Sequence, residues 1–352
     1  MRQLASIQLV TSAEPIPNAD AIERLRVLGW SIVAKKGEFP GGEKVVYCEI
    51  DSLLPEWPPF EFLRPSSYKA AIIEGDHQLQ RAGFRIRTVK LRGQVSQGIC
   101  FPLSILPTGT PTEVGTNVTD ALQIIKYEPP VPAGMGGTVK GTFPAFLPKT
   151  DETRIQVLEP LLTKYRGHKF HMTEKLDGTS FTAFLHKGEF GICSRNQWLD
   201  ETDESNILSR IAKGLRLREK LEAIKGRFDF DGAIQGEVIG PGIQGNKYGL
   251  NQVELHVFNL IDISRYCLVD HETSVAATEL VGLKTVPRLG DIILNHSIDE
   301  LVDLSAGTSI LNSKVQREGI VFRPAVEVYE PLIGGRLSFK VINPHFLLKY
   351  GE

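Results

Sequence analysis

The chain has 352 residues, of which 41% are hydrophobic and 23% are charged, and its formal net charge is -2. This length suffices for two ordinary domains that bury their cores without metal or disulfide staples. The net charge excludes a polycation, so any binding of nucleic acid must come from local basic patches. The cysteines form no C-x-x-C pair, which argues against a structural zinc site.

The sequence carries no pattern typical of membranes or secretion. No apolar stretch approaches the roughly 20 residues of a membrane helix, and residues 1–10 lack the long apolar core of a signal peptide. Scattered cysteines in a chain of this size are typical of reduced thiols. We therefore expect a cytoplasmic protein without a membrane partner. We also expect a monomer, because no coiled-coil repeat is present.

Short strand patterns separated by glycine and proline fill the first part of the chain, at 24–36, 44–50, 84–91 and 99–103. Several short strands with few helices predict a small β-barrel or sandwich. A stretch rich in proline and glycine, 127–149, predicts a domain boundary. Mixed strands and helices follow, with the clearest helix at 206–225, which predicts an α+β domain.

One strand pattern of the first module, Phe84-Arg85-Ile86-Arg87-Thr88-Val89-Lys90, alternates apolar with basic or polar residues over its first half, and Arg92 follows it. The apolar side chains would face the barrel interior and the basic ones would face outward. An outward basic row is typical of a groove that follows a nucleic-acid backbone. An ordinary solvated strand face gives the same pattern, and the charge pattern alone favours that reading.

Lys175 stands in the segment Glu174-Lys175-Leu176-Asp177-Gly178, between two strand patterns. Asp-Gly is a strong tight-turn dipeptide, so the segment by itself predicts a hairpin with an incidental lysine. The segments that follow in chain order make the pattern more specific. They are Ser194-Arg195-Asn196, Gln235-Gly236-Glu237-Val238, Val257-Phe258-Asn259-Leu260, Arg317-Glu318-Gly319-Ile320-Val321 and Ser338-Phe339-Lys340-Val341-Ile342-Asn343.

This ordered set resembles the motifs of the covalent nucleotidyltransferases, which comprise RNA ligases, DNA ligases and mRNA capping enzymes. The segments 149–156, 45–55 and 90–98 resemble the ATP-dependent RNA ligases that carry an N-terminal OB-fold domain. The similarity covers nearly the whole chain. It implies an OB-type β-barrel with a linker over residues 1–147. A nucleotidyltransferase domain of antiparallel sheets with flanking helices is implied over residues 148–352.

The resemblance also implies a role for each motif residue. Lys175 would attack the α-phosphate of ATP and form a lysyl–AMP intermediate. An amine attacks only when unprotonated, so we expect the site to lower the pKa of Lys175 by several units from about 10.4. Contacts to ATP or AMP are implied for Arg154, Glu174, Arg195, Glu237, Phe258 and Lys340, and binding of Mg²⁺ or Mn²⁺ for Asp177, Glu237 and Glu318.

Several of these residues also have an ordinary structural reading. Asp177 taken alone is a turn residue, and Glu237 and Glu318 are solvated strand ends. Phe258 is a core aromatic residue on a strand, a reading that is compatible with stacking on adenine. One departure from the family pattern is Ile342, where related ligases often have a second lysine. Lys340 would then contact the α-phosphate alone, or Lys349 or another base would substitute.

The expected function is RNA ligation, the sealing of a 3′-hydroxyl to a 5′-phosphate in nicked RNA or an RNA-containing duplex. DNA ligases and capping enzymes usually place an OB domain after the last motif, whereas only residues 344–352 follow that motif here. A capping-type guanylyltransferase, a DNA ligase and a non-catalytic OB-fold nucleic-acid-binding protein are the alternatives.

A further pattern, Gly240-Pro241-Gly242-Ile243-Gln244-Gly245, matches the dinucleotide fingerprint G-x-G-x-x-G. That fingerprint works at a strand-to-helix turn, whereas a strand pattern, 252–261, follows it here. We therefore expect no dinucleotide site and interpret the segment as a flexible connector that would lie near the substrate.

Overall fold

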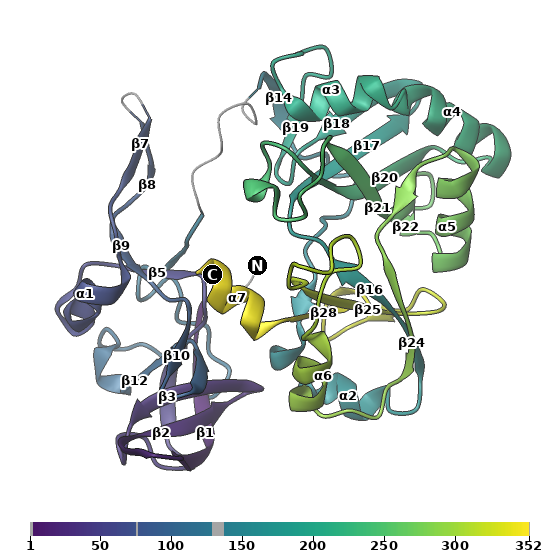
Figure 1. Cartoon of the computed structure of the whole chain (residues 1–352). Coiled ribbons are helices and arrows are strands. Elements are labelled where there is room, and N and C mark those ends of the chain that lie inside the picture. Colours follow the sequence, from purple (N-terminus) through teal and green to yellow (C-terminus); the bar gives the residue numbers. More distant parts are fainter. Residues whose placement is uncertain (1–2, 75–76, 129–136, 352) are drawn as a thin grey trace. The chain divides into compact units, whose positions relative to one another are not determined.

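The computed structural model describes residues 3–74, 77–128 and 137–351 (Figure 1). The chain forms two compact units, Met1–Pro130 with Pro344–Glu352, and Val131–Asn343. The boundary expected at 147/148 thus falls within the second unit, and residues 344–352 belong with the first. Part of the stretch expected to be a linker, residues 129–136, lies outside the described residues. No helix of the described residues has the length and apolar character needed to cross a membrane.

The first unit is built from antiparallel strands around one long bent strand, β1. Its first half pairs with β4 and its second half with β2, and a register shift between Val10 and Ser12 marks the change of partner. Such a bulge bends a strand and lets a sheet curl into a barrel. The five-stranded sheet has the order β12 (Ile99–Phe101), β4 (Lys44–Cys48), β1 (Ala5–Ile16), β2 (Ala19–Val27) and β3 (Trp30–Lys35).

Shorter elements complete the first unit. A second sheet has the order β13 (Ile125–Lys126), β5 (Ser52–Leu54), β9 (Gly83–Arg85) and β6 (Tyr68–Lys69). Two hairpins are β7 (Ile72–Glu74) with β8 (His77–Gln80), and β10 (Thr88–Leu91) with β11 (Gln94–Gln97). The helical segments are η1 (Pro58–Leu63), α1 (Arg64–Ser67), η2 (Leu103–Ile105) and the C-terminal α7 (Pro344–Tyr350).

The alternation expected along residues 84–87 is confirmed, because Phe84 and Ile86 are buried while Arg87 is exposed. The expected single strand is wrong, because Phe84 and Arg85 end β9, residues 86–87 lie between the strands and β10 begins at Thr88. Arg85 is engaged within the unit, since its guanidinium stacks 4.4 Å from the ring centroid of Tyr127 and donates a 3.2 Å hydrogen bond to the carbonyl oxygen of Gly351. Arg85 therefore ties the end of α7 to the barrel.

The second unit contains two larger sheets. The eight-stranded sheet has the order β14 (Val139–Thr142), β19 (Gln197–Leu199), β18 (Glu189–Cys193), β17 (Thr179–His186), β20 (Gly232–Ile239), β21 (Glu254–Asp262) and β22 (Cys267–Leu268), with β23 (Lys284–Thr285) also beside β21. The five-stranded sheet has the order β15 (Thr153–Arg154), β28 (Phe339–Ile342), β25 (Gly319–Pro324), β16 (Lys169–Lys175) and β24 (Arg288–Ile293). A small hairpin joins β26 (Tyr329–Glu330) to β27 (Gly335–Arg336).

Helical segments cover one face of each sheet of the second unit (Figure 1). The helical segments of the second unit are η3 (Ile155–Val157), α2 (Glu159–Lys164), α3 (Ile207–Gly214), α4 (Leu217–Phe228), η4 (Gln244–Asn246), α5 (His271–Leu280) and α6 (Ile298–Ser305). The single helix expected at 206–225 is wrong, because α3 and α4 are separated at Arg216, whose φ of 54° is left-handed. Asn206 is the N-cap of α3, because its side-chain oxygen accepts a 2.7 Å hydrogen bond from the backbone N–H of Leu208.

Successive side chains of a strand point to opposite sides, so each large sheet has two distinct faces. In the eight-stranded sheet both faces carry apolar residues, because Phe184, Ala233 and Ile261 form a further buried cluster on the side opposite the helices. In β16 and β28, Phe170, Phe339 and Val341 join a core that contains Leu161 of α2 and Leu301 of α6. The alternate positions of these strands, which include the last residue of β16, lie on the other face. In the eight-stranded sheet, a second core joins one face to α3, α4 and α5. Lys175, Lys340 and Glu237 lie on the faces opposite these two helix-covered cores.

Candidate active site

Lys175 is the last residue of β16 and lies opposite Gly319 of β25 in the strand register. Its ammonium nitrogen lies 2.7 Å from Oε1 and 2.8 Å from Oε2 of Glu318. The Lys175 side chain keeps 27% of its surface exposed, and that of Glu318 keeps 11%. The amine is therefore largely shielded from water but can still be reached by a ligand.

The pKa of Lys175 differs from the value expected from the sequence. Burial acts to lower the pKa of this ammonium group, but the carboxylates of Glu318, Glu237 and Asp177 outweigh burial and hold the pKa above its ordinary value. The expected lowering of the pKa by several units is thus not produced by the protein groups in this arrangement. A nucleophilic role for Lys175 requires that the negative charge of these carboxylates be neutralised when substrates bind.

The turn after Lys175 links the two large sheets rather than forming the hairpin that its Asp-Gly dipeptide predicts, because β16 and β17 belong to different sheets. The backbone N–H of Gly178 donates a 3.0 Å hydrogen bond to Oε1 of Glu237 on β20. A Cβ atom at Gly178 would lie 2.3 Å from the carbonyl oxygen of Val238. Only glycine fits so close to the neighbouring backbone, and this contact places the turn against Glu237.

Glu237 has an unusual affinity for protons. Burial raises the pKa of its carboxyl group to about 8, and the nearby carboxylates of Glu318 and Asp177 add to this effect while Lys175 opposes it. A buried carboxyl group of this kind is common where a site is built to bind a cation or transfer protons. The carboxylates expected to act together are therefore brought together around Lys175.

Asp177 is held by two residues of the loop that contains the glycine-rich segment 240–245. Its backbone N–H donates a 2.7 Å hydrogen bond to the hydroxyl oxygen of Tyr248, and its carboxylate forms an ion pair with Lys247. Both tyrosine and lysine follow the glycine-rich segment 240–245. The segment 240–245 lies in the loop between β20 and β21, so a strand follows it as expected. The interpretation of the loop as a flexible connector missed these contacts.

Glu174 takes the strand position before Lys175 and is almost fully buried, at 1% exposed. Its Oε2 accepts a 2.8 Å hydrogen bond from the backbone N–H of Ile310, and its own N–H donates to the carbonyl oxygen of Pro287 at 2.8 Å. Burial raises the pKa of this carboxyl group. Glu174 therefore anchors the loop that leads to Glu318.

Lys340 and Arg154 are neighbours on parallel strands, β28 and β15. Lys340 also lies opposite Val321, which in turn lies opposite Thr173. Side chains of directly opposed residues point to the same side of a sheet, so Lys340 shares the face of Lys175, two residues along the strand. The strand register thus places Lys175 and Lys340 on the same face of the five-stranded sheet, opposite its helix-covered core.

Ile342 occupies the row of Lys175 itself, because both lie opposite Gly319. Its side chain is buried, at 2% exposed. An aliphatic group therefore fills the position at which related ligases often carry a second lysine. Lys349, one substitute considered from the sequence, lies in α7 of the first unit.

Phe258 on β21 is partly buried beside Leu176, Tyr248 and Val286. Arg323 of β25 donates a 2.7 Å hydrogen bond to the carbonyl oxygen of Phe258 and also forms a 2.9 Å ion pair with Glu152. This contact joins the two sheets beside the aromatic ring and fixes the segment that precedes Arg154. Core packing and an exposed ring surface for adenine are both compatible with this position.

Arg195 lies in the turn between β18 and β19 and is half exposed. Its guanidinium forms a 2.6 Å ion pair with Asp151. None of the hydrogen bonds and ion pairs found for Arg195 reaches the carboxylates around Lys175 within the part of the chain that the structure describes. The contacts of Arg195 thus do not link it to the Lys175 cluster.

The carboxylates of Asp177, Glu237 and Glu318 supply the oxygen ligands that Mg²⁺ and Mn²⁺ prefer. No group of three or more His, Cys, Asp or Glu side chains among the described residues is arranged to hold a metal ion directly. Mg²⁺ keeps several of its waters in protein sites, so such a cation does not require direct contact with all of these carboxylates. The donor chemistry and the mutual repulsion of the carboxylates fit a divalent cation.

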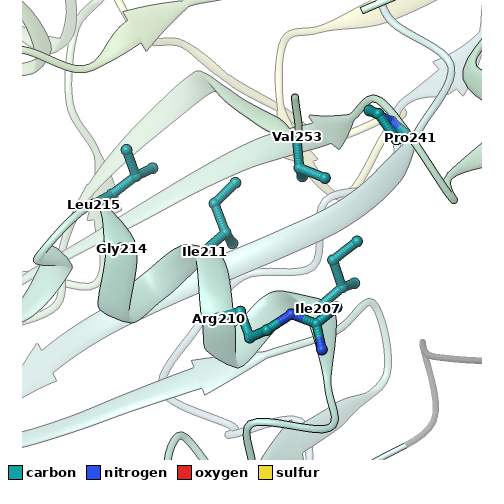
Figure 2. A pocket seen from close by; sticks show the side chains of 7 residues that line it. All are labelled: Ile207, Arg210, Ile211, Gly214, Leu215, Pro241 and Val253. Atoms are coloured by element: carbon teal, nitrogen blue, oxygen red, sulfur yellow. The ribbon is translucent and has the colours of Figure 1, made fainter. Parts of the chain in front are cut away.

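A groove of about 400 Å³ lies elsewhere in the second unit (Figure 2). Its lining residues are Ile207, Arg210, Ile211, Gly214, Leu215, Pro241 and Val253. Ile211 of α3 belongs to the core that packs on the helix-covered face of the eight-stranded sheet, together with Phe181 and Val238. Glu237 alternates with Val238 along β20 and so points to the opposite face. The groove is therefore separate from the Lys175 cluster.

Comparisons with known proteins support both halves of this description. A family profile described as an OB-fold domain matches residues 4–103, and one described as RNA ligase matches residues 168–342. A search of curated proteins finds no match. These matches agree with the expected order of an OB-type barrel followed by a sheet-rich domain.

Solved structures of a Naegleria gruberi RNA ligase resemble the whole chain at 35% sequence identity. A mutant with ATP and Mn gives a TM-score of 0.88 and covers 100% of both chains. The form with pyrophosphate gives a TM-score of 0.87, covering 99% of this chain and 98% of that chain. An apo mutant gives 0.86, covering 98% and 97%. The expected fold is confirmed, and this chain belongs to the RNA ligase family, with an OB-fold domain at its N-terminal end.

Proposed function

We propose that this ligase seals 3′-hydroxyl and 5′-phosphate ends at nicks in RNA or RNA-containing duplexes, with ATP as co-substrate and Lys175 as the nucleophile. The observation that carries the proposal is the Lys175 ammonium group held by Glu318 in the same cluster as Glu237 and Asp177. The relative from Naegleria gruberi was solved with ATP and Mn, which supports ATP and a divalent cation as ligands here.

In the first step, Nζ of Lys175 loses its proton and attacks the α-phosphorus of ATP. A phosphorus–nitrogen bond forms, the bond to the bridging oxygen breaks, and pyrophosphate leaves. Such transfers depend mostly on positioning and on electrostatic stabilisation of the phosphate oxygens. A bound Mg²⁺ or Mn²⁺, held by Asp177, Glu237 and Glu318, would neutralise the carboxylates and stabilise negative charge on the phosphates.

In the second step, an oxygen of the RNA 5′-phosphate attacks the AMP phosphorus, and the bond to Lys175 breaks. In the third, the 3′-hydroxyl attacks the adenylated 5′-phosphate, the phosphodiester forms and AMP leaves. Lys340 is proposed to contact the α-phosphate as a point charge, and Arg154 the outer phosphates of ATP. Arg195, Glu174 and Phe258 are proposed to hold the adenosine, the last by stacking on the base.

The test is incubation of the purified protein with ATP labelled at the α-phosphate and Mg²⁺, followed by denaturing electrophoresis. We expect label on the protein, and none on Lys175→Ala with an unchanged melting temperature. Absence of label on the folded wild-type protein would favour a non-catalytic nucleic-acid-binding role. Labelling by GTP in place of ATP would indicate capping chemistry.

Nicked duplexes with RNA or DNA on each side of the nick then distinguish an RNA ligase from a DNA ligase. We expect sealing when the 3′-hydroxyl strand is RNA, and equal sealing of an all-DNA nick would contradict the proposal.

We also propose that the enzyme is cytoplasmic and monomeric. Cys48, Cys100, Cys193 and Cys267 are all free thiols, as is usual in a reducing compartment, and sedimentation would test the monomer.

A further inference from the structure

The last strand of the site, β28, carries one lysine where the family pattern often has two. Ile342, buried at 2% exposed, takes the row of Lys175, so β28 contributes only the ammonium group of Lys340 to this face. The carboxylates of Asp177, Glu237 and Glu318 all act on Lys175. Carboxylates that repel one another lose their arrangement unless positive charge is fixed beside them.

Lys247 brings an ammonium group to this cluster from outside the motifs. It forms an ion pair with the Asp177 carboxylate, and the two side chains are only 12% and 13% exposed. Asp177 lies two residues after the nucleophile in the turn that joins the sheets. An ion pair shielded from solvent in this way fixes the geometry of both partners more strongly than a surface pair does.

The loop that carries Lys247 is held in one conformation. The hydroxyl group of Tyr248 accepts from the Asp177 backbone, and the Tyr248 carbonyl oxygen accepts a 2.9 Å hydrogen bond from the Asn312 side chain. Asn246 spans the loop through hydrogen bonds of 2.9 Å and 3.0 Å with the backbone of Leu250. Consecutive residues thus grip the side chain and the backbone of Asp177.

From these contacts we propose that Lys247 is a positioning residue for adenylylation of Lys175, acting through Asp177. Lys247 supplies from the 240–250 loop the positive charge that the last strand lacks at Ile342. The inference rests on the proposed lysyl–AMP chemistry. Without the Lys247 ammonium group, the Asp177 carboxylate loses its ion-pair partner beside Glu237 and Glu318, and we expect the turn that places Lys175 to shift.

The test compares Lys247→Met, which keeps the length of the side chain without its charge, with Lys247→Arg, which keeps the charge. We expect the maximal rate of label transfer from ATP to fall about 10- to 100-fold in Lys247→Met, the loss typical of a small misplacement in an active site. The KM for ATP should change far less than the rate. Lys247→Arg should recover much of the rate, and Lys314→Met, an exposed lysine, should match wild type.

Rescue provides the sharper test. If Lys247 supplies the charge that Ile342 does not, then Ile342→Lys added to Lys247→Met should restore part of the lost rate. Should this double variant melt at a much lower temperature, the comparison of Lys247→Met with Lys247→Arg decides instead. A wild-type rate in Lys247→Met overturns the inference, and so does an equal loss in both single variants with a lowered melting temperature.

These outcomes are separable from failure of the proposed function. If wild-type protein takes no label from ATP, the lysyl–AMP chemistry itself is wrong. If wild type labels and Lys175→Ala does not, while Lys247→Met labels at the wild-type rate, only the role of Lys247 is wrong.

Discussion

Glu318 holds the ammonium group of Lys175 through both of its carboxylate oxygens, at 2.7 Å and 2.8 Å. These residues are 143 positions apart in the chain, and the pairing of β16 with β25 brings them together. The contact stabilises the protonated lysine, which is the form that cannot attack phosphorus. The protein without substrates is thus arranged to keep Lys175, the proposed nucleophile, charged.

Removing that partner should make Lys175 easier to deprotonate. Glu318→Gln removes the carboxylate that contributes most to the raised pKa of Lys175, so the pKa of the lysine should fall. The reactivity of Lys175 toward an amine-acylating reagent, followed by mass spectrometry in metal-free buffer, should therefore rise at lower pH than in wild type. The reactivity of Lys314 serves as the internal control. An unchanged or higher pKa would contradict the prediction.

Glu237 should make stability depend on pH in the direction opposite to most carboxyl groups. Its folded pKa of about 8 lies above the ordinary value of 4.5, so the folded state binds the extra proton. The stability linked to this proton is present below about 4.5 and is lost as pH rises toward about 8.

Glu237→Gln should therefore raise the melting temperature relative to wild type more at pH 8 than at pH 5, by about 2–4 °C for each kcal/mol regained. Thermal unfolding in metal-free buffer measures this difference. Equal shifts at both pH values would show that Glu237 does not titrate in this range.

Gly178 should not tolerate any side chain. In Gly178→Ala, the new Cβ would meet the carbonyl oxygen of Val238 at 2.3 Å, so the turn between the sheets must move. We expect adenylylation to fall about 100-fold, with a lower melting temperature. Gly226→Ala is the matched control, because Gly226 lies exposed in α4 with no atom within 4 Å of its added Cβ. The free energy of unfolding of Gly226→Ala should rise by about 0.5–1 kcal/mol, and its activity should not fall.

Arg195 separates a structural ion pair from a contact with the nucleotide. Its pair with Asp151 is exposed, and exposed pairs contribute about 0–1 kcal/mol. Arg195→Ala should leave the melting temperature nearly unchanged but raise the KM for ATP in the labelling assay about 10-fold, because the charge-assisted contact to the nucleotide is lost. Asp151→Asn breaks the same ion pair and should leave the KM near wild type. Equal effects of both substitutions would refute a contact between Arg195 and ATP.

The barrel should act on RNA rather than on ATP. Arg87 and Lys90 are exposed on the basic segment, whereas Arg85 is engaged by Asp51, Tyr127 and Gly351. The double substitution Arg87→Glu with Lys90→Glu should weaken binding and sealing of nicked RNA, reduce the salt dependence of binding, and leave adenylylation unchanged. Substitution is cleaner than deletion of the barrel, which would leave α7 without its partner. Equal losses in adenylylation and sealing would indicate a structural role.

The motif residues were predictable because each has a recognisable sequence neighbourhood, and the resemblance supplied their common location. Lys247 was not, since its partner Asp177 is 70 positions away and the loop before it matches an unrelated fingerprint. The break at Arg216 was missed because its local mark, Gly214 at the end of α3, is also tolerated inside a helix, and the apolar spacing continues through it. The direction of the Lys175 pKa depends on whether carboxylates or burial prevail, and only three-dimensional distances decide that balance.

The C-terminal helix α7 has a consequence for how the protein is made. Because Pro344–Glu352 packs with Met1–Pro130, the second unit is inserted within the first. During translation the barrel emerges first but must wait for its last element until all of Val131–Asn343 has been synthesised. A ribosome stalled before residue 344 would therefore carry a barrel in which Arg85 lacks the Gly351 carbonyl oxygen.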